Sequence, residues 1–308
     1  MAGTSIAHGA AAVLLVAALV LVGANRVNDA QAQDAEPGVT SKQYTYKQTP
    51  QGELKIFVDV PPGWSATDKR PAIVFFFGGA WHSGSVAQFA DQARYLAGRG
   101  LVAARADYRV KSRQDVTPDK CVEDAKTAMR WVKAHAAELG VDPEKVIGSG
   151  GSAGGHVAAC TALIPGVQAE GDDLSISTRP CALVLFNPVL NMAGSERMIE
   201  RVGSKEMAEA ISPIHHLGKD APPAIMFYGT KDRMLAMGEE YCPKAKELGV
   251  RAEMYTAEEQ AHGFFNRAPW KQRTLYKADE FLASLGYLEG KPTLEVPAEG
   301  GELKRWEP

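Results

Sequence analysis

Short apolar runs alternate with amphipathic stretches along most of the chain. Continuous apolar runs, typical of strands covered on both faces, are found at 71–77, 101–107, 182–188 and 224–228, and 251–255 is expected to be the last strand. Alternating stretches at 40–48 and 54–60 predict an opening pair of strands, and helical periodicity predicts helices at 86–99, 118–136, 238–248 and 271–285. This order indicates an α/β fold with a doubly wound, mostly parallel sheet of about eight strands and helices on both faces.

The pattern changes at both ends and once in the middle. Residues 10–23 are apolar and precede the small-x-small sequence Ala30–Ala32, so we expect a signal peptide over 1–32, cut after Ala32, and a secreted or periplasmic product without a stable membrane span. An uncleaved N-terminal anchor is the alternative, because no Lys or Arg precedes the apolar stretch. One domain is expected over 33–288, with a short lid-like insertion near 189–220, and a flexible, solvated tail over 289–308.

Composition excludes some classes of partner. The net charge is −3, and no basic stripe with interleaved aromatic residues occurs, so no nucleic-acid partner is expected. Four cysteines allow three disulfide pairings after export, of which Cys160–Cys181 is the first guess, and buried free thiols are the alternative. No C-x-x-C or His/Cys cluster suggests a metal site.

The stretch 145–156 is an apolar strand that breaks into glycine and restarts as a helix. Gly150, Ser152 and Gly154 form the G-x-S-x-G pattern of a nucleophile elbow. The residues two before and two after the serine must be small, so that the backbones can pass each other at the sharp turn. Glycine-rich runs also occur as simple turns or phosphate loops, and the rest of the chain must decide between these alternatives.

Three chemically competent residues each follow the end of an expected strand. Ser152, Asp232 and His262 occur in the chain order that marks the α/β-hydrolase arrangement. In that arrangement His262 takes the proton of Ser152 as the serine attacks an acyl carbonyl, and Asp232 orients the imidazole. The alternatives are a turn aspartate and a surface-loop histidine. Glu258 and Glu259 are rival acids, but they lie too close to His262 in sequence.

An acyl-transfer site also needs donors for the oxyanion. The backbone N–H groups of Gly79, Ala80 and Ala153 are the candidates, although a tight turn alone would also explain the first two. The residues expected to contact substrate are Phe77, Gly78, Trp81 and Gly151. His156 is expected to be a packing residue, and Asp107 and Arg109 are expected to pair with each other.

These motifs together resemble a known superfamily. The elbow followed by Ala-Gly-Gly-His, the Gly-Gly-x-Trp loop, Asp107-Tyr108-Arg109, Ser212-Pro213 and Gly229-Thr-Lys-Asp232 look like the hormone-sensitive-lipase-like and feruloyl or acetylxylan esterase branches of the α/β-hydrolases. The resemblance covers roughly 44–288 and implies a serine esterase without a cofactor. The chain departs from the family pattern at Phe77, where many relatives carry histidine, at Ala80, where a third glycine is usual, and at Gly151, where an acidic or polar residue is common.

The expected function is therefore that of an exported serine carboxylesterase. Its substrates would be small esters with short acyl groups, such as acetyl, and an acylated carbohydrate is the analogy that the resemblance suggests. Two alternatives remain open at this point: an exopeptidase of the same fold, and a hydrolase-like binding protein that has lost activity.

Overall fold

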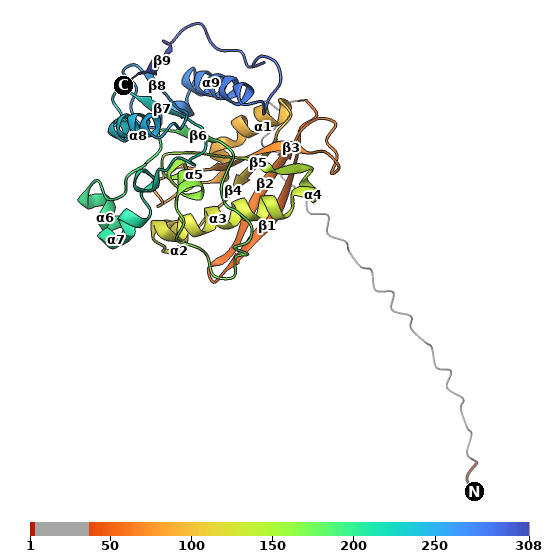
Figure 1. Ribbon diagram of the computed structural model, residues 1–308. Coiled ribbons are helices and arrows are strands. Elements are labelled where there is room, and N and C mark those ends of the chain that lie inside the picture. The colour runs from red at the N-terminus through yellow and green to blue at the C-terminus, as the bar shows by residue number, and fades with distance from the viewer. Residues whose placement is uncertain (4–36, 308) are drawn as a thin grey trace. The chain divides into compact units, whose positions relative to one another are not determined.

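The computed structural model describes residues 1–3 and 37–307, and the expected signal peptide therefore lies, apart from its first residues, outside the described part. Residues 37–307 form one compact unit. Its centre is a nine-stranded sheet in the order β1-β2-β4-β3-β5-β6-β7-β8-β9 (Figure 1). The strands are β1 (Thr40–Thr49), β2 (Gly52–Val60), β3 (Arg70–Phe76), β4 (Val102–Ala106), β5 (Val141–Gly151), β6 (Leu183–Phe186), β7 (Ala224–Gly229), β8 (Ala252–Ala257) and β9 (Leu303–Trp306).

The strands from β3 to β8 run parallel, and antiparallel pairs close the sheet on both sides. β1 pairs with β2 and β2 with β4 in antiparallel register, and β9 does the same with β8. The parallel pairs bring the carboxyl ends of β5, β6, β7 and β8 to one edge of the sheet. In a doubly wound sheet, ligands bind at that edge. The predicted fold class is confirmed, with one strand more than expected.

Helices cover both faces of the sheet. The α-helices are α1 (Ala90–Gly98), α2 (Lys111–Gln114), α3 (Pro118–Ala134), α4 (Ala136–Leu139), α5 (Ala153–Leu163), α6 (Glu196–Val202), α7 (Lys205–Ala210), α8 (Leu235–Glu247) and α9 (Trp270–Ser284). Short 3-10 turns are η1 (Val86–Phe89), η2 (Pro213–His216) and η3 (Phe264–Asn266). α3, α5 and α8 pack on one face, and α1 and α9 pack on the other.

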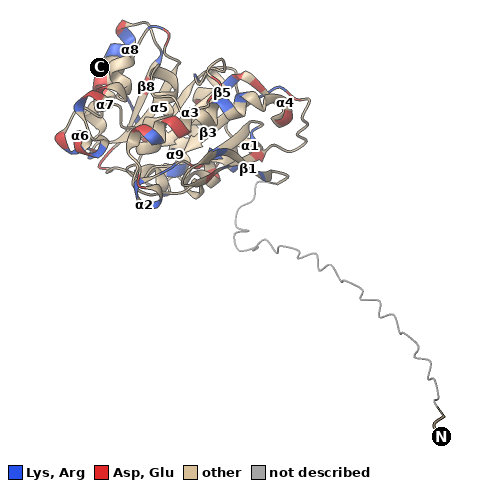
Figure 2. Cartoon of the chain, turned by 90° about the horizontal axis from the view of Figure 1, so that it is seen from below, with Lys and Arg blue, Asp and Glu red and all other residues tan. Residues whose placement is uncertain are grey.

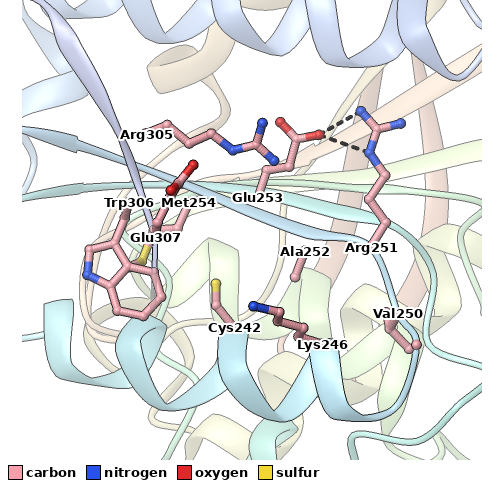
Figure 3. A pocket seen from close by; sticks show the side chains of 11 residues that line it. Cys242, Lys246, Val250, Arg251, Ala252, Glu253, Met254, Arg305, Trp306 and Glu307 are labelled. Atoms are coloured by element: carbon pink, nitrogen blue, oxygen red, sulfur yellow. Dashed lines mark hydrogen bonds and ion pairs between the residues drawn. The ribbon is translucent and has the colours of Figure 1, made fainter.

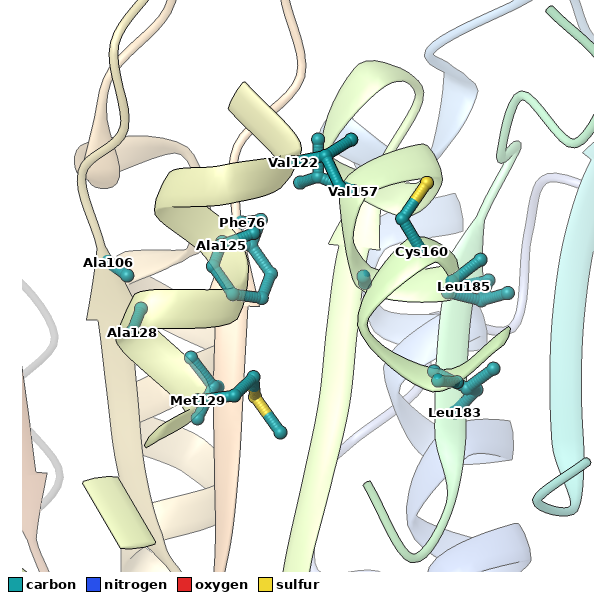
Figure 4. Packing of buried hydrophobic residues seen from close by; sticks show 14 of the residues in the cluster. Phe76, Ala106, Val122, Ala125, Ala128, Met129, Val157, Cys160, Leu183 and Leu185 are labelled. Carbon is teal, nitrogen blue, oxygen red and sulfur yellow. The ribbon is translucent and has the colours of Figure 1, made fainter. Parts of the chain in front are cut away.

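Successive side chains along each strand point to opposite faces of the sheet, and this divides the hydrophobic core into two clusters. In β3, Val74 and Phe76 belong to the cluster under α3 and α5, whereas Ile73 and Phe75 belong to the cluster under α1 and α9. Figure 4 shows the first cluster, in which the apolar stripe of α3 faces the sheet beside α5. Burial on both faces explains why these strands are continuous apolar runs in the sequence.

The C-terminal segment differs from the prediction of a solvated tail. Its residues Leu303–Trp306 form β9, which pairs with β8 so that Trp306 lies opposite Met254. Trp306, Met254 and Cys242 of α8 also line a cavity of ≈ 620 Å³ at this edge (Figure 3). Residues 303–306 of the tail are therefore part of the sheet, and β8 is not its last strand.

All four cysteines are free thiols. The suggested Cys160–Cys181 disulfide is wrong because the sheet lies between the two residues. Cys160 is in the cluster under α3 and α5, whereas Cys181 packs against the cluster on the opposite face. None of the helices in the described part of the chain is long and apolar enough to cross a membrane.

Candidate active site

Ser152 lies on the sharp turn between β5 and α5. Its φ of 54° and ψ of −117° are unusual for a residue other than glycine, as a nucleophile elbow requires. A Cβ on Gly150 would lie 2.4 Å from the carbonyl carbon of Gly154, and a Cβ on Gly154 would lie 2.0 Å from the carbonyl oxygen of Phe76. The steric reason for the two glycines, inferred from their spacing, is confirmed.

Two hydrogen bonds connect Ser152, His262 and Asp232. Ser152 Oγ lies 2.8 Å from His262 Nε2, and His262 Nδ1 lies 2.8 Å from Asp232 Oδ2. Because Oδ2 can only accept, Nδ1 carries the proton, and the unprotonated Nε2 accepts from the serine hydroxyl. The Asp232 carboxylate is 1% exposed, and its other oxygen accepts from the Met234 N–H at 2.8 Å. The Asp232 carboxylate is thus fixed, and it fixes the His262 imidazole in turn.

Neighbouring strand ends bring these three side chains together. Asp232 follows β7, and His262 follows β8 after a short loop. The Lys231 N–H donates to the Gln260 carbonyl at 2.9 Å, and a Cβ on Gly229 would lie only 2.0 Å from that same carbonyl oxygen. Gly229 is therefore required for the close approach of the loops that carry Asp232 and His262.

Asn187 is a site residue that the sequence analysis missed. It directly follows β6, between the elbow and the Asp232 loop in the sheet, and its Oδ1 accepts from the Gly263 N–H at 3.0 Å. The sequence does carry a usable indication, because Asn187 ends an apolar strand at the same edge as Ser152, Asp232 and His262.

The glycine loop after β3 packs on the elbow. A Cβ on Gly78 would lie 2.9 Å from the Gly151 carbonyl oxygen and 3.3 Å from Ser152 Cβ. Gly79 has a φ of +127°, and a Cβ there would lie 2.1 Å from the Ser83 carbonyl oxygen. In the described part of the chain, no hydrogen bond uses the N–H groups of Gly79 and Ala80. Ala153 is the first residue of α5, where N–H groups have no carbonyl one turn back.

A cavity of ≈ 600 Å³ opens above Ser152. It is lined by residues of the elbow, the glycine loop, the lid-like insertion and the loops that follow β7 and β8: Ala80, Trp81, Ser152, Val189, Ser195, Arg197, Met198, Arg201, Lys231, Asp232, Arg233, Met234, Ala261 and His262. The insertion expected near 189–220 thus forms a wall of the pocket through α6. The sequence analysis missed its arginines because the apolar periodicity there is weak. The larger cavity at the β8–β9 edge contains none of the three hydrogen-bonded residues.

Three of the four expected substrate contacts are wrong. Trp81 lines the pocket, but Phe77, Gly78 and Gly151 do not. The Phe77 ring is 1% exposed and stacks on Tyr108 with ring centroids 4.1 Å apart. A Cβ on Gly151 would lie 2.4 Å from Phe265 Cζ, so Gly151 faces the core rather than the rim.

The expected pair between Asp107 and Arg109 is also absent. Asp107 pairs with Arg113 at 2.7 Å, and Arg109 pairs with the buried Asp124 at 2.8 Å. Both ion pairs support the loop after β4, so the supporting role was inferred correctly and the partners were not.

His156 holds Trp81 in place from below the pocket. The Trp81 indole N–H donates to His156 Nδ1 at 3.1 Å, and His156 Nε2 donates to the Ile211 carbonyl at 2.7 Å. Burial lowers the pKa of His156 to about 4, although the Ile211 carbonyl opposes this shift. The ring is therefore neutral and has both nitrogens occupied, as expected of a packing histidine.

No group of three or more His, Cys, Asp or Glu in the described residues could hold a metal ion.

Comparisons with known proteins find a matching family model and similarity to esterases. The family model BD-FAE matches residues 59–240. A probable carboxylic ester hydrolase, LipM of Mycobacterium tuberculosis, is 30% identical over 191 residues, which are 56% of this chain and 44% of LipM. Esterase LipQ of the same organism is 28% identical over 76% of this chain and 58% of its own length. The chain thus spans about half the length of the curated relatives that it matches.

Among solved structures, the apo form of Thermogutta terrifontis esterase 2 superposes with a TM-score of 0.78. It is 46% identical and covers 85% of this chain and 100% of its own. The same esterase has been solved with propionate bound, at a TM-score of 0.76 and 46% identity over 84% of this chain and 98% of its own.

Proposed function

Because this chain belongs to the BD-FAE family and is an α/β-hydrolase serine esterase, we propose that it hydrolyses carboxylic esters through Ser152, His262 and Asp232. The observation that carries the proposal is the continuous hydrogen-bonded series from Asp232 through His262 to Ser152, with both distances at 2.8 Å, on the wall of a pocket. A serine hydroxyl within hydrogen-bond reach of an imidazole, and an imidazole within reach of a carboxylate, support the roles of nucleophile, base and orienting acid.

In the proposed reaction, Ser152 Oγ attacks the acyl carbon while its proton passes to His262 Nε2. The carbonyl oxygen becomes an oxyanion and accepts from the N–H groups of Gly79, Ala80 and Ala153. As the intermediate collapses, the carbon–oxygen bond to the alcohol breaks and His262 gives its proton to the leaving alcohol. Water, deprotonated by His262, then attacks the acyl carbon of the acyl-enzyme. The bond from that carbon to Ser152 Oγ breaks, His262 returns the proton to Oγ, and the carboxylic acid leaves. Asp232 holds the Nδ1–H throughout and stabilises the imidazolium.

Hydrolysis of 4-nitrophenyl acetate, propionate, butyrate and octanoate by the wild-type chain and by Ser152→Ala tests the mechanism. A loss of about 10⁴-fold or more in kcat is expected, by comparison with serine proteases that lose a triad member. The kcat of Asp232→Asn is expected to be lower by a similar factor. Ser175→Ala, which removes a serine hydroxyl from an exposed loop, is the matched control and should keep the wild-type kcat. Retained turnover in Ser152→Ala would exclude the mechanism.

The acyl group is proposed to be short, and an acylated carbohydrate is proposed as the natural substrate. The propionate-bound structure of Thermogutta terrifontis esterase 2 supports a small acyl group, and the carbohydrate rests on the family resemblance alone. This choice is tested by comparing the rates at which the chain releases acetate from acetylated xylan, ferulate from feruloyl esters and the amine from aminoacyl amides. Faster cleavage of the amides would favour an exopeptidase.

We propose that the chain is exported, because the apolar stretch 10–23 and the small residues at 30–32 are typical of a cleaved signal peptide. Mass spectrometry of the chain after expression in its host is expected to find a new N-terminus at Gln33. Recovery of the intact N-terminus would favour the uncleaved anchor.

A further inference from the structure

The pocket above Ser152 is strongly cationic at its wall. Four basic side chains line it, and the only acidic side chain among its lining residues is Asp232, which His262 already engages. The basic residues are Arg197 and Arg201 of α6 and Lys231 and Arg233 of the loop after β7. The chain as a whole has a net charge of −3, and Figure 2 shows acidic and basic residues mixed over its elements, so the excess of cations is local.

Most of these cations have no carboxylate partner. Lys231 forms an ion pair with Glu259. In the part of the chain that the structure describes, Arg197, Arg201 and Arg233 form no ion pair. Guanidinium groups that face a shared cavity without counter-charges repel each other, and an anion placed between them would relieve that repulsion.

α6 presents its two arginines together. Arg197 and Arg201 are four residues apart and therefore share one helix face. Glu196 and Glu200, one position before each of them, do not line the pocket. Burial lowers the pKa of Arg201, and the charge of Arg197 adds a smaller effect in the same direction.

Arg201 connects this wall to the reaction centre. Its guanidinium donates to the Ala80 carbonyl in the glycine loop and lies 5.9 Å from the centroid of the Trp81 ring. Ala80, Arg201 and Ser152 line the same cavity, so one small molecule in it can contact both the arginines and Ser152.

We propose that Arg197 and Arg201, assisted by Arg233, form a subsite for an anionic group, and that the preferred substrate is an ester that carries a carboxylate on its acyl or alcohol half. Guanidinium groups match the geometry of carboxylate oxygens and bind them through paired hydrogen bonds. The inference rests on the proposed esterase function and narrows its substrate class.

Two pairs of isosteric esters test the subsite and locate the anion. For the acyl half, monoethyl adipate is compared with the ethyl ester of adipic acid monoamide. For the alcohol half, 3-carboxyphenyl acetate is compared with 3-carbamoylphenyl acetate. In each pair a carboxylate replaces a neutral amide of the same shape. We expect kcat/KM to favour the carboxylate about tenfold in at least one pair, equivalent to about 1.4 kcal/mol, and the preference to decrease as salt is added.

Charge-removing variants assign the preference to the arginines. In Arg197→Gln the carboxylate-to-amide ratio is expected to fall at least threefold, and in Arg197→Gln/Arg201→Gln it is expected to approach one. Arg197→Lys should keep most of the ratio. Lys205→Gln on α7 removes the same charge outside the pocket and should leave the ratio unchanged. Arg197→Gln alone leaves the Arg201–Ala80 contact in place, so the test does not depend on the double variant folding.

The possible outcomes separate this inference from the proposed function. Ser152→Ala should abolish hydrolysis of all four esters, which tests the mechanism alone. If the wild-type chain hydrolyses the two esters that carry a neutral amide but shows no preference for the carboxylate in either pair, the anionic subsite is refuted. The proposed esterase function is then unaffected. A preference that persists unchanged in the double variant also refutes the assignment to these arginines.

Discussion

Asn187 and Gly263 are joined by a hydrogen bond in which the Gly263 N–H donates to Asn187 Oδ1 at 3.0 Å. Asn187 has a φ of 39°, and its own N–H donates to the Phe227 carbonyl at 2.7 Å, so its position is fixed by the sheet. Gly263 directly follows His262. The amide of Asn187 therefore fixes the backbone next to the proposed base, and we regard Asn187 as a positioning residue.

Asn187→Ala is expected to lower kcat for 4-nitrophenyl butyrate about 10- to 100-fold, because small displacements of a catalytic group are costly. The KM should change little, since Asn187 does not line the pocket. Steady-state kinetics measure the two parameters separately.

Asn187→Gly is the companion variant, because glycine adopts a positive φ without strain and also lacks the side-chain acceptor. It should be as slow as Asn187→Ala. If Asn187→Gly had wild-type kcat, the backbone conformation and not the hydrogen bond would be what matters.

Gly151→Ala is expected to destabilise the fold by about 1–3 kcal/mol through overpacking. The new methyl group would lie 2.4 Å from the ring of Phe265. That ring is buried, stacks on Phe89 and packs at a tilt against Phe186, so it has little room to move. Denaturant unfolding measures the loss. Gly166→Ala is the matched control, because a Cβ there meets nothing within 4 Å.

A second substitution checks that contact directly. Gly151→Ala/Phe265→Leu should be more stable than the sum of the two single changes implies, because the smaller side chain makes room for the methyl group. Additive losses would mean that the Gly151–Phe265 contact is not the cause.

The elbow and the three hydrogen-bonded residues could be predicted because a short motif and the order of the strands carry their requirements. Gly150 is dictated by a backbone contact with Gly154, and Gly154 by a backbone contact with Phe76 at the end of the adjacent β3, so the glycine spacing around Ser152 reflects both contacts. Parallel strands bring Asp232 and His262 to the same edge wherever the intervening segments run. Order along the chain was therefore enough to identify them.

Other features depend on which face of an element a side chain occupies, and the sequence does not contain that information directly. Phe77 lies next to the glycine loop in sequence, yet its ring points to Tyr108 in the core. Cys160 and Cys181 are close in sequence but lie on opposite faces of the sheet. β9 is short and polar, and only its pairing with the open edge of β8 identifies it as a strand.

Removal of residues 299–308 is expected to lower the free energy of unfolding by about 1–2 kcal/mol, because it uncovers β8 and part of the apolar surface at Met254. Esterase activity below the unfolding transition should stay within twofold, since β9 contributes nothing to the pocket of Ser152. Thermal unfolding and turnover are measured on the same samples.

Trp306→Ala tests the same edge without shortening the chain. It should produce a large part of the loss in stability, because Trp306 lies opposite Met254 and packs against the core. Unchanged stability in both variants would mean that β9 does not hold the edge.

His156 is expected to make the protein sensitive to acid. Its pKa is about 4 in the folded chain, against 6.5 in the unfolded chain. As the pH falls from 6.5 toward 4, the unfolded chain therefore takes up a proton that the folded chain does not. The contribution of His156 to the free energy of unfolding is fully present above pH 6.5 and is lost through this window. The loss is about 3–4 kcal/mol at most, at about 1.4 kcal/mol for each unit of pKa difference.

The same protonation would disturb the pocket wall. Nδ1 of His156 accepts from the Trp81 indole at 3.1 Å, and a proton on that nitrogen would face the indole N–H, so acid should displace Trp81 as well as weaken the fold. His156→Gln keeps an acceptor and a donor but does not titrate. Urea unfolding at pH 7 and pH 4.5 should therefore show a smaller decrease for His156→Gln than for the wild-type chain, and equal decreases would assign the acid sensitivity to other groups.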